Sequence, residues 1–184
     1  MEPLIAKFGL SGDWQARGGT LQGALATLAI TQSVGGVLGG ILISTWGGLK
    51  RQRVLGVLVP MVVSGLAFAA FGASATVLGA AAALLVLGLT LPAMNAHSQS
   101  IWQSQVPPEM QGRVFSVRRL IAQFTAPAST ALAGALAARY APGSVAVVAG
   151  LVLAAVAALQ LLNPVLRRVE DPSLAAHGTE MPAS

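Results

Sequence analysis

Residues 76–97 have the sequence TVLGAAAALLVLGLTLPAMNAH, with no acidic side chain, lysine or arginine along their length. A helix that crosses about 30 Å of hydrocarbon needs roughly 20 consecutive, mostly apolar residues, and this stretch is long enough. In lipid, only helices and closed barrels satisfy all backbone hydrogen bonds. A membrane barrel would show alternating segments of about ten residues, which this sequence lacks. Residues 76–97 therefore predict a transmembrane helix.

Similar apolar stretches occur on both sides, separated by polar residues, glycine or proline. They cover residues 23–46, 54–73, 114–138 and 145–166. We expect the span over 76–97 to continue past His97 as a short amphipathic extension, until Pro107 and Pro108 remove backbone donors and stop it. The prediction is an all-α integral membrane protein with a domain of five transmembrane helices over residues 23–166.

The composition excludes an ordinary soluble domain, because 54% of the residues are hydrophobic and only 9% are charged. No acidic residue falls within a predicted span. Cysteine is absent, which excludes a disulfide framework, a thiol nucleophile and a cysteine-ligated metal site. The sequence suggests no metal and no cofactor, and an enzyme is not expected because no convergent acids, histidines or activated nucleophile are visible.

The basic residues gather in small clusters between the spans, which is a membrane-topology pattern and not a nucleic-acid-binding face. One side of the membrane receives Lys50, Arg51, Arg53, Arg113, Arg118, Arg119, Arg167 and Arg168. The other side receives Lys7, Arg17 and Arg139. The positive-inside rule then places residues 1–22 outside the cytoplasm and residues 167–184 inside it, as a disordered tail.

The span over 23–46 contains two overlapping glycine pairs, Gly35 with Gly39 and Gly36 with Gly40. Small residues four apart form a groove into which another helix can pack closely. The partner helix can belong to the same chain or to a second copy.

Two connections between the spans carry distinctive residues. Trp46 to Arg53 form a tight basic turn that includes Gly47, Gly48, Lys50 and Arg51. The next basic connection, residues 103–116, has the sequence QSQVPPEMQGRVFS and includes Gly112 and Arg113.

The connection over 103–116, after a span that ends LPAMNA, resembles the link between the tenth and eleventh helices of bacterial major facilitator superfamily exporters of the macrolide-efflux type. Three further segments resemble the same family. The start of the chain is similar to the exit from the seventh helix, residues 35–53 to the eighth helix and its basic turn, and residues 166–171 to the end of the twelfth.

This resemblance implies helices eight to twelve of a twelve-helix transporter, which is an incomplete C-terminal six-helix half. It implies export of small amphipathic or drug-like solutes by alternating access, in the inner membrane of a bacterial cell. The implied partners are membrane lipid, the solute, and either the N-terminal half or another copy of the chain. Any proton-coupling carboxylate would lie outside this sequence. The alternative is a truncated, non-transporting membrane protein that acts as a packing or regulatory partner.

Four amide side chains within the predicted helices are the candidates for lining a solute cavity: Gln32, Asn95, Gln99 and Gln123. The alternative role for them is ordinary hydrogen bonding between helices. His97 is expected at the membrane interface or as a residue that complements the helix dipole, and the alternative is a proton relay. We expect Arg113 to contact carbonyl groups or an acid at a neighbouring helix end and so to hold one state of a gate.

Overall fold

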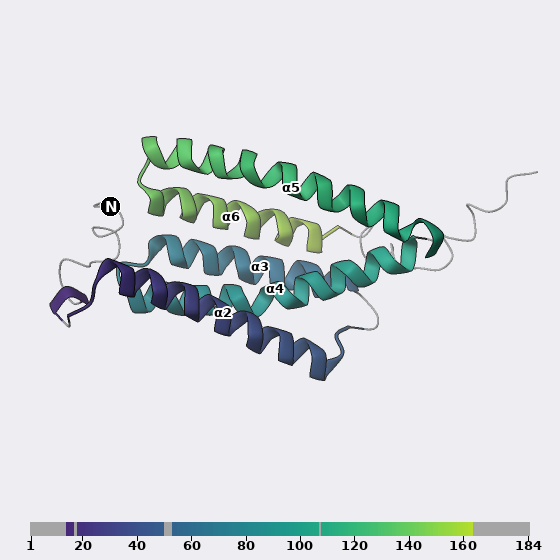
Figure 1. Cartoon of the computed structure of the whole chain (residues 1–184), viewed down its shortest axis with the longest axis horizontal. Helices are drawn as coiled ribbons and strands as arrows, with labels where there is room; N and C mark the ends of the chain where they lie inside the picture. Colours follow the sequence, from purple (N-terminus) through teal and green to yellow (C-terminus); the bar gives the residue numbers. More distant parts are fainter. Residues whose placement is uncertain (1–13, 17, 50–52, 107, 164–184) are drawn as a thin grey trace, which may run out of the picture.

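The computed structural model describes residues 14–16, 18–49, 53–106 and 108–163. Within these residues it contains five long helices and no strand. The helices are α2 (Leu21–Trp46), α3 (Arg53–Ala73), α4 (Val77–Gln105), α5 (Pro108–Arg139) and α6 (Pro142–Leu161). Successive helices run in opposite directions, so the α2–α3 and α4–α5 connections lie at the same end of the bundle (Figure 1). The all-α prediction is confirmed for the described part of the chain.

Threonine caps begin two of the helices. The Thr20 hydroxyl accepts a hydrogen bond from the Gly23 N–H at 3.1 Å, and the Thr76 hydroxyl accepts one from the Gly79 N–H at the same distance. These bonds satisfy backbone donors that have no partner inside the helix. α2 ends at Gly47, whose φ of 76° is a left-handed conformation that glycine adopts without strain.

α4 continues through Pro92 to Gln105, so the predicted extension beyond His97 is confirmed. Its last turn closes when the Val106 N–H donates to the Trp102 carbonyl at 3.1 Å. α5 then begins at Pro108, earlier than the predicted start at residue 114. Proline suits this position, because the N–H groups of the first residues of a helix have no acceptor within the helix.

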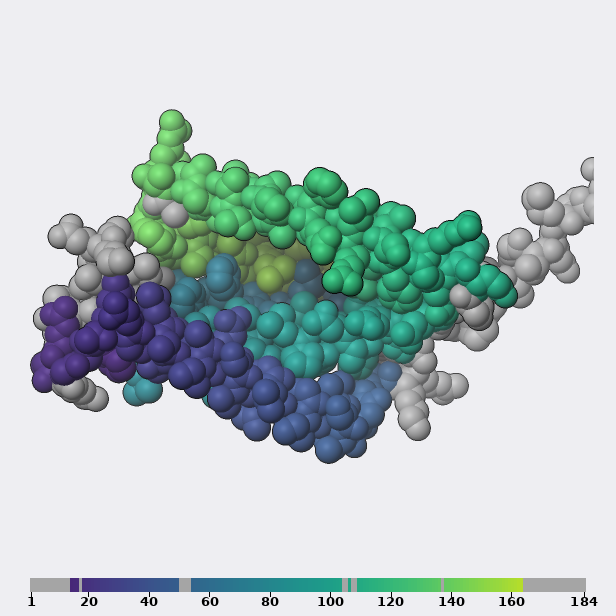
Figure 2. Space-filling model, in the orientation of Figure 1, coloured from purple at the N-terminus to yellow at the C-terminus, as the bar shows by residue number. Residues whose placement is uncertain are grey.

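α3 lies at the centre of the bundle, with α4 on one side and α6 on the other, and α2 packs against the outer side of α4. α5 makes only a small contact with α6. Figure 2 shows α5 as a separate ridge along α6, with a recess between α5 and α4. α5 is therefore the helix with the least support from the rest of the chain.

Glycines allow α2 and α4 to pack closely. Gly35 and Gly39 are buried, and a Cβ added to either would strike the carbonyl oxygen of Leu85 or Leu89 on α4. A Cβ on Gly88 of α4 would in turn strike the backbone of α2. The small residues therefore let the two backbones approach directly, as in other membrane helix pairs.

The two glycine pairs of α2 thus have different surroundings. Gly35 and Gly39 pack within the chain, whereas a Cβ on Gly36 or Gly40 would meet nothing within 4 Å. The sequence left open whether the partner of this groove belongs to the same chain or to a second copy. For Gly35 and Gly39 the partner is α4.

The α3–α6 contact has the same physical basis. A Cβ on Gly65 would lie 2.6 Å from the Ala154 nitrogen, and a Cβ on Gly150 would lie 2.5 Å from the Gly65 oxygen. The sequence alone does not indicate this contact, because Gly65 and Gly150 are not spaced four apart along one helix.

Four helices among the described residues are long and apolar enough to cross a membrane: Leu21–Trp46, Val54–Ala73, Val77–Gln103 and Pro142–Leu161. Many of their large apolar side chains are exposed, as a lipid-facing surface requires. The fifth predicted span falls on α5, which is not in this group. Its first turns carry Glu109, Arg113, Arg118 and Arg119, and polar residues interrupt the remainder. A fifth crossing therefore stays a prediction, and the predicted tail over 167–184 lies outside the described residues.

Candidate functional site

The four candidate amides have no partner within the described part of the chain. Asn95, Gln99 and Gln123 are exposed, and Gln32 is half-buried. None of these side chains forms a hydrogen bond with a described residue. The interhelical hydrogen bonds that we considered as an alternative role are therefore not formed among these residues.

Asn95 and Gln99 lie together on α4, one turn apart. They follow Gly88 by seven and eleven residues, and this spacing keeps all three on one side of the helix. α2 covers this side at Gly88. Figure 1 shows the later parts of α2 and α4 diverging from this contact. The two amides are exposed because α2 leaves the stripe of α4 on which they lie.

Gln32 lies near the start of the same stripe, since its carbonyl oxygen is the atom that a Cβ on Gly88 would strike. Gln123 is elsewhere. It lies on α5, five residues after Arg118, which rotates it by about 140° from the side of α5 that meets α4. The structure therefore groups Asn95 with Gln99, places the Gln32 backbone against Gly88 about two turns before Asn95, and leaves Gln123 apart.

The glycine turn after α2 is tied to α4 by His97. Gly47 and Gly48 have φ values of 76° and 70°, which confirms a tight turn at these residues. The Leu49 N–H that follows donates to Nε2 of His97 at 3.0 Å. Nδ1 of His97 lies 2.7 Å from the Ala93 carbonyl oxygen, to which it donates when Nε2 accepts. Lys50 and Arg51 lie outside the described residues.

His97 is only 4% exposed, because described residues surround its imidazole. Its expected place at the membrane interface stays a prediction. α4 continues past it, and the imidazole lies between the glycine turn and α3. A Cβ added to Gly56 would lie 2.6 Å from Cγ of His97, and a Cβ on Gly48 would lie 3.1 Å from its Nε2. The lack of side chains at these two glycines makes room for the ring.

A second polar contact joins α3 and α4 near the middle of the bundle. The buried Ser64 hydroxyl lies within hydrogen-bonding distance of the Thr90 hydroxyl, which also lies 2.8 Å from the Leu87 carbonyl oxygen. The Ser64 hydroxyl also lies 3.6 Å from the sulfur of Met94. The sequence alone does not indicate this pair, because serine and threonine are common in apolar helices and can bond to their own backbone.

The end of α4 and the start of α5 form the walls of an open hollow of about 410 Å³. It is lined by Trp102, Arg113, Val114, Val117, Arg118 and Ile121. Arg118 donates through Nη2 to the Ser98 hydroxyl at 3.2 Å, and its Cζ lies 5.8 Å from the centre of the Trp102 ring.

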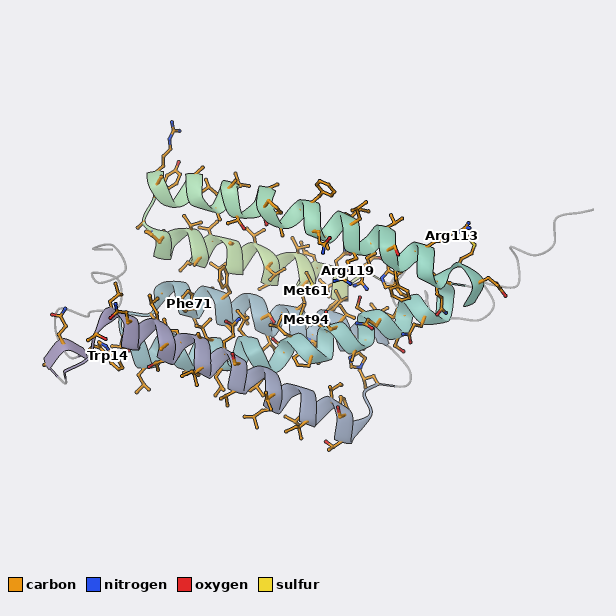
Figure 3. All side chains as sticks on the ribbon, viewed as in Figure 1. Trp14, Met61, Phe71, Met94, Arg113 and Arg119 are labelled. Carbon is orange, nitrogen blue, oxygen red and sulfur yellow. The ribbon has the colours of Figure 1, made fainter. Side chains whose placement is uncertain are left out.

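The expected gate contact of Arg113 is not made by the described residues and stays a prediction. Among the described residues, Arg113 has no carbonyl or acidic partner. Figure 3 shows its side chain extending outward from the start of α5. Gly112 is exposed, and a Cβ there would meet nothing within 4 Å. Packing against described atoms therefore does not require a glycine at this position.

In the described ranges, no three histidine, aspartate or glutamate side chains gather closely enough to hold a metal ion. The chain matches no protein-family model, and the comparisons with curated proteins and with solved structures gave no significant match.

Proposed function

We propose that this chain forms part of a membrane transporter of the major facilitator type, in which the Asn95–Gln99 face of α4 lines the solute cavity. The observation that carries the proposal is the exposure of these two neighbouring amides, without a hydrogen-bonding partner among the described residues, between long apolar helices.

An amide without a hydrogen-bonding partner is costly in hydrocarbon, by about 1–3 kcal/mol on scales derived from protein mutations. Two such groups one turn apart on a membrane helix need either a polar partner or water. A water-filled cavity between this bundle and a second set of helices supplies both. α5, with its small contact to α6, would gain its missing support from the same second set of helices.

Pro92 gives α4 a place to bend between its packed part and its amide-bearing part. Proline has no N–H, so the carbonyl of Gly88, four residues earlier, loses its helical donor. The segment before this point is packed on α2, and the segment after it carries Asn95 and Gln99. Bending at Pro92 would open and close the cavity, as alternating access requires. The proposed cargo is a small amphipathic solute, and the proposed direction is export across a bacterial inner membrane.

The chain has no cysteine, so single cysteines can report on this face. In native membranes, Asn95→Cys and Gln99→Cys should react with a water-soluble maleimide. Val152→Cys, an exposed apolar position on α6, should not react because it faces lipid. If Asn95→Cys and Gln99→Cys were as unreactive as Val152→Cys, the proposed cavity would not exist.

Protection by a solute tests transport more directly. Rhodamine 6G, an amphipathic dye, should slow the labelling of Asn95→Cys and Gln99→Cys without slowing that of Pro142→Cys in the α5–α6 connection. The alternative function, a non-transporting packing partner, is favoured by the open pair of Gly36 and Gly40. That alternative predicts no protection at any position.

A further inference from the structure

The hollow between α4 and α5 has almost entirely apolar walls, and two arginines contribute to its lining. Val117 and Ile121 supply part of the apolar wall, and Arg113 and Arg118 also line it. The only acidic residue within the described ranges is Glu109, which is exposed in the first turn of α5 and makes no ion pair with either arginine there. Apart from the Ser98 bond and the Trp102 ring, the guanidinium donors of Arg118 are not used by described residues.

The length of α4 favours a position of this hollow near the membrane surface. α4 has 29 residues and α5 has 32. At about 1.5 Å per residue α4, the apolar helix of the two, exceeds the roughly 30 Å of the hydrocarbon core by more than about 10 Å. The hollow lies where α4 ends and α5 begins, at the end of the bundle that also carries the glycine turn after α2 (Figure 1). Trp102 in its lining is typical of the headgroup region.

Arginine binds phosphate oxygens through a planar set of donors, and a charge that lacks an acidic partner attracts an anion. The apolar wall suits a ligand with a hydrocarbon part better than a fully hydrated ion. We propose that this hollow binds one acidic phospholipid. Its phosphate contacts Arg118 and is approached by Arg113, and its first acyl carbons lie against Val117 and Ile121. This lipid site depends on insertion of the helices into a membrane, but it does not depend on the proposed transport function.

Native mass spectrometry of the purified chain in detergent tests the site, with phosphatidylglycerol and phosphatidylcholine of identical acyl chains. Phosphatidylglycerol should bind more tightly. Arg118→Gln should weaken its binding about tenfold, since it removes a charge-assisted contact. Arg113→Gln removes only a nearby charge and should weaken binding by less. Val117→Trp should abolish binding by filling the hollow while leaving both arginines in place.

Two controls separate the site from general effects. Arg119→Gln removes a neighbouring charge that does not line the hollow and should leave binding unchanged. Ser98→Ala removes the bond to Arg118 but keeps its charge, and should also retain the lipid. Equal binding of phosphatidylcholine, or equal loss in Arg119→Gln, would overturn the proposal. Displacement of phosphatidylglycerol by inorganic phosphate at the same concentration would show that the ligand is a free anion.

Discussion

Gly56→Ala and His97→Ala form a double-mutant cycle that tests how the α2–α3 turn is held. A methyl group on Gly56 would overlap the buried imidazole, 2.6 Å from its Cγ. Overpacking of this kind costs about 1–3 kcal/mol, against a helix-propensity gain of up to about 1 kcal/mol for replacing glycine by alanine. Gly56→Ala should therefore be destabilised by roughly 1–2 kcal/mol net.

His97→Ala removes the acceptor for the Leu49 N–H and leaves a cavity beside Gly56. The lost bond contributes about 1 kcal/mol, and the cavity adds to this cost. In the double variant the new methyl group enters the space that the ring vacated. Its destabilisation should fall short of the sum of the single effects by about 0.5–3 kcal/mol.

The assay is unfolding of the purified chain in mixed micelles with increasing sodium dodecyl sulfate, followed by circular dichroism. Gly36→Ala is the matched control, because a Cβ there meets nothing within 4 Å and the substitution should not destabilise the bundle. Strictly additive effects of Gly56→Ala and His97→Ala would refute the proposed fit between the ring and the glycine.

Two further predictions concern topology and helix crossing. A cysteine introduced at Gln52 should be shielded from an impermeant thiol reagent in intact cells while one at Pro142 reacts, because basic residues favour the cytoplasmic side. The opposite labelling pattern would show that the chain has the opposite orientation in the membrane. Gly39→Ala should destabilise the chain by more than about 1 kcal/mol in the same unfolding assay, because its methyl group meets the Leu89 backbone, which cannot move aside as a side chain can. Gly40→Ala, whose methyl group enters open space, should not, and equal effects of the two would show that α2 does not pack on α4 through this face.

The helices could be predicted because the length and polarity of each stretch determine them locally. The predicted span over 54–73 agrees to within one residue with the bounds of α3, and the capping threonines are visible in the sequence. α5 was less predictable, because its start at Pro108 lies within a polar stretch that periodicity assigns to a loop.

The contacts between helices were predicted less completely, because sequence spacing gives the face of a helix but not the neighbour that covers it. The adjacency of Asn95 and Gln99 follows from their spacing, but their exposure depends on where α2 leaves α4. The burial of His97 depends on Gly56 and on a turn some fifty residues earlier, and no local pattern indicates either. The space at Gly112 likewise depends on the surroundings of the helix and not on its sequence.

The crossing of α2 and α4 at Gly35, Gly39 and Gly88 is made by backbone atoms. Rotation at most helix contacts requires interdigitated side chains to change rotamers, and each such change meets a barrier. Glycines have no rotamers, so this contact can act as a pivot on which small rotations of α2 against α4 leave the local packing intact. The width of the opening beside Asn95 and Gln99 can then vary without repacking at the crossing itself.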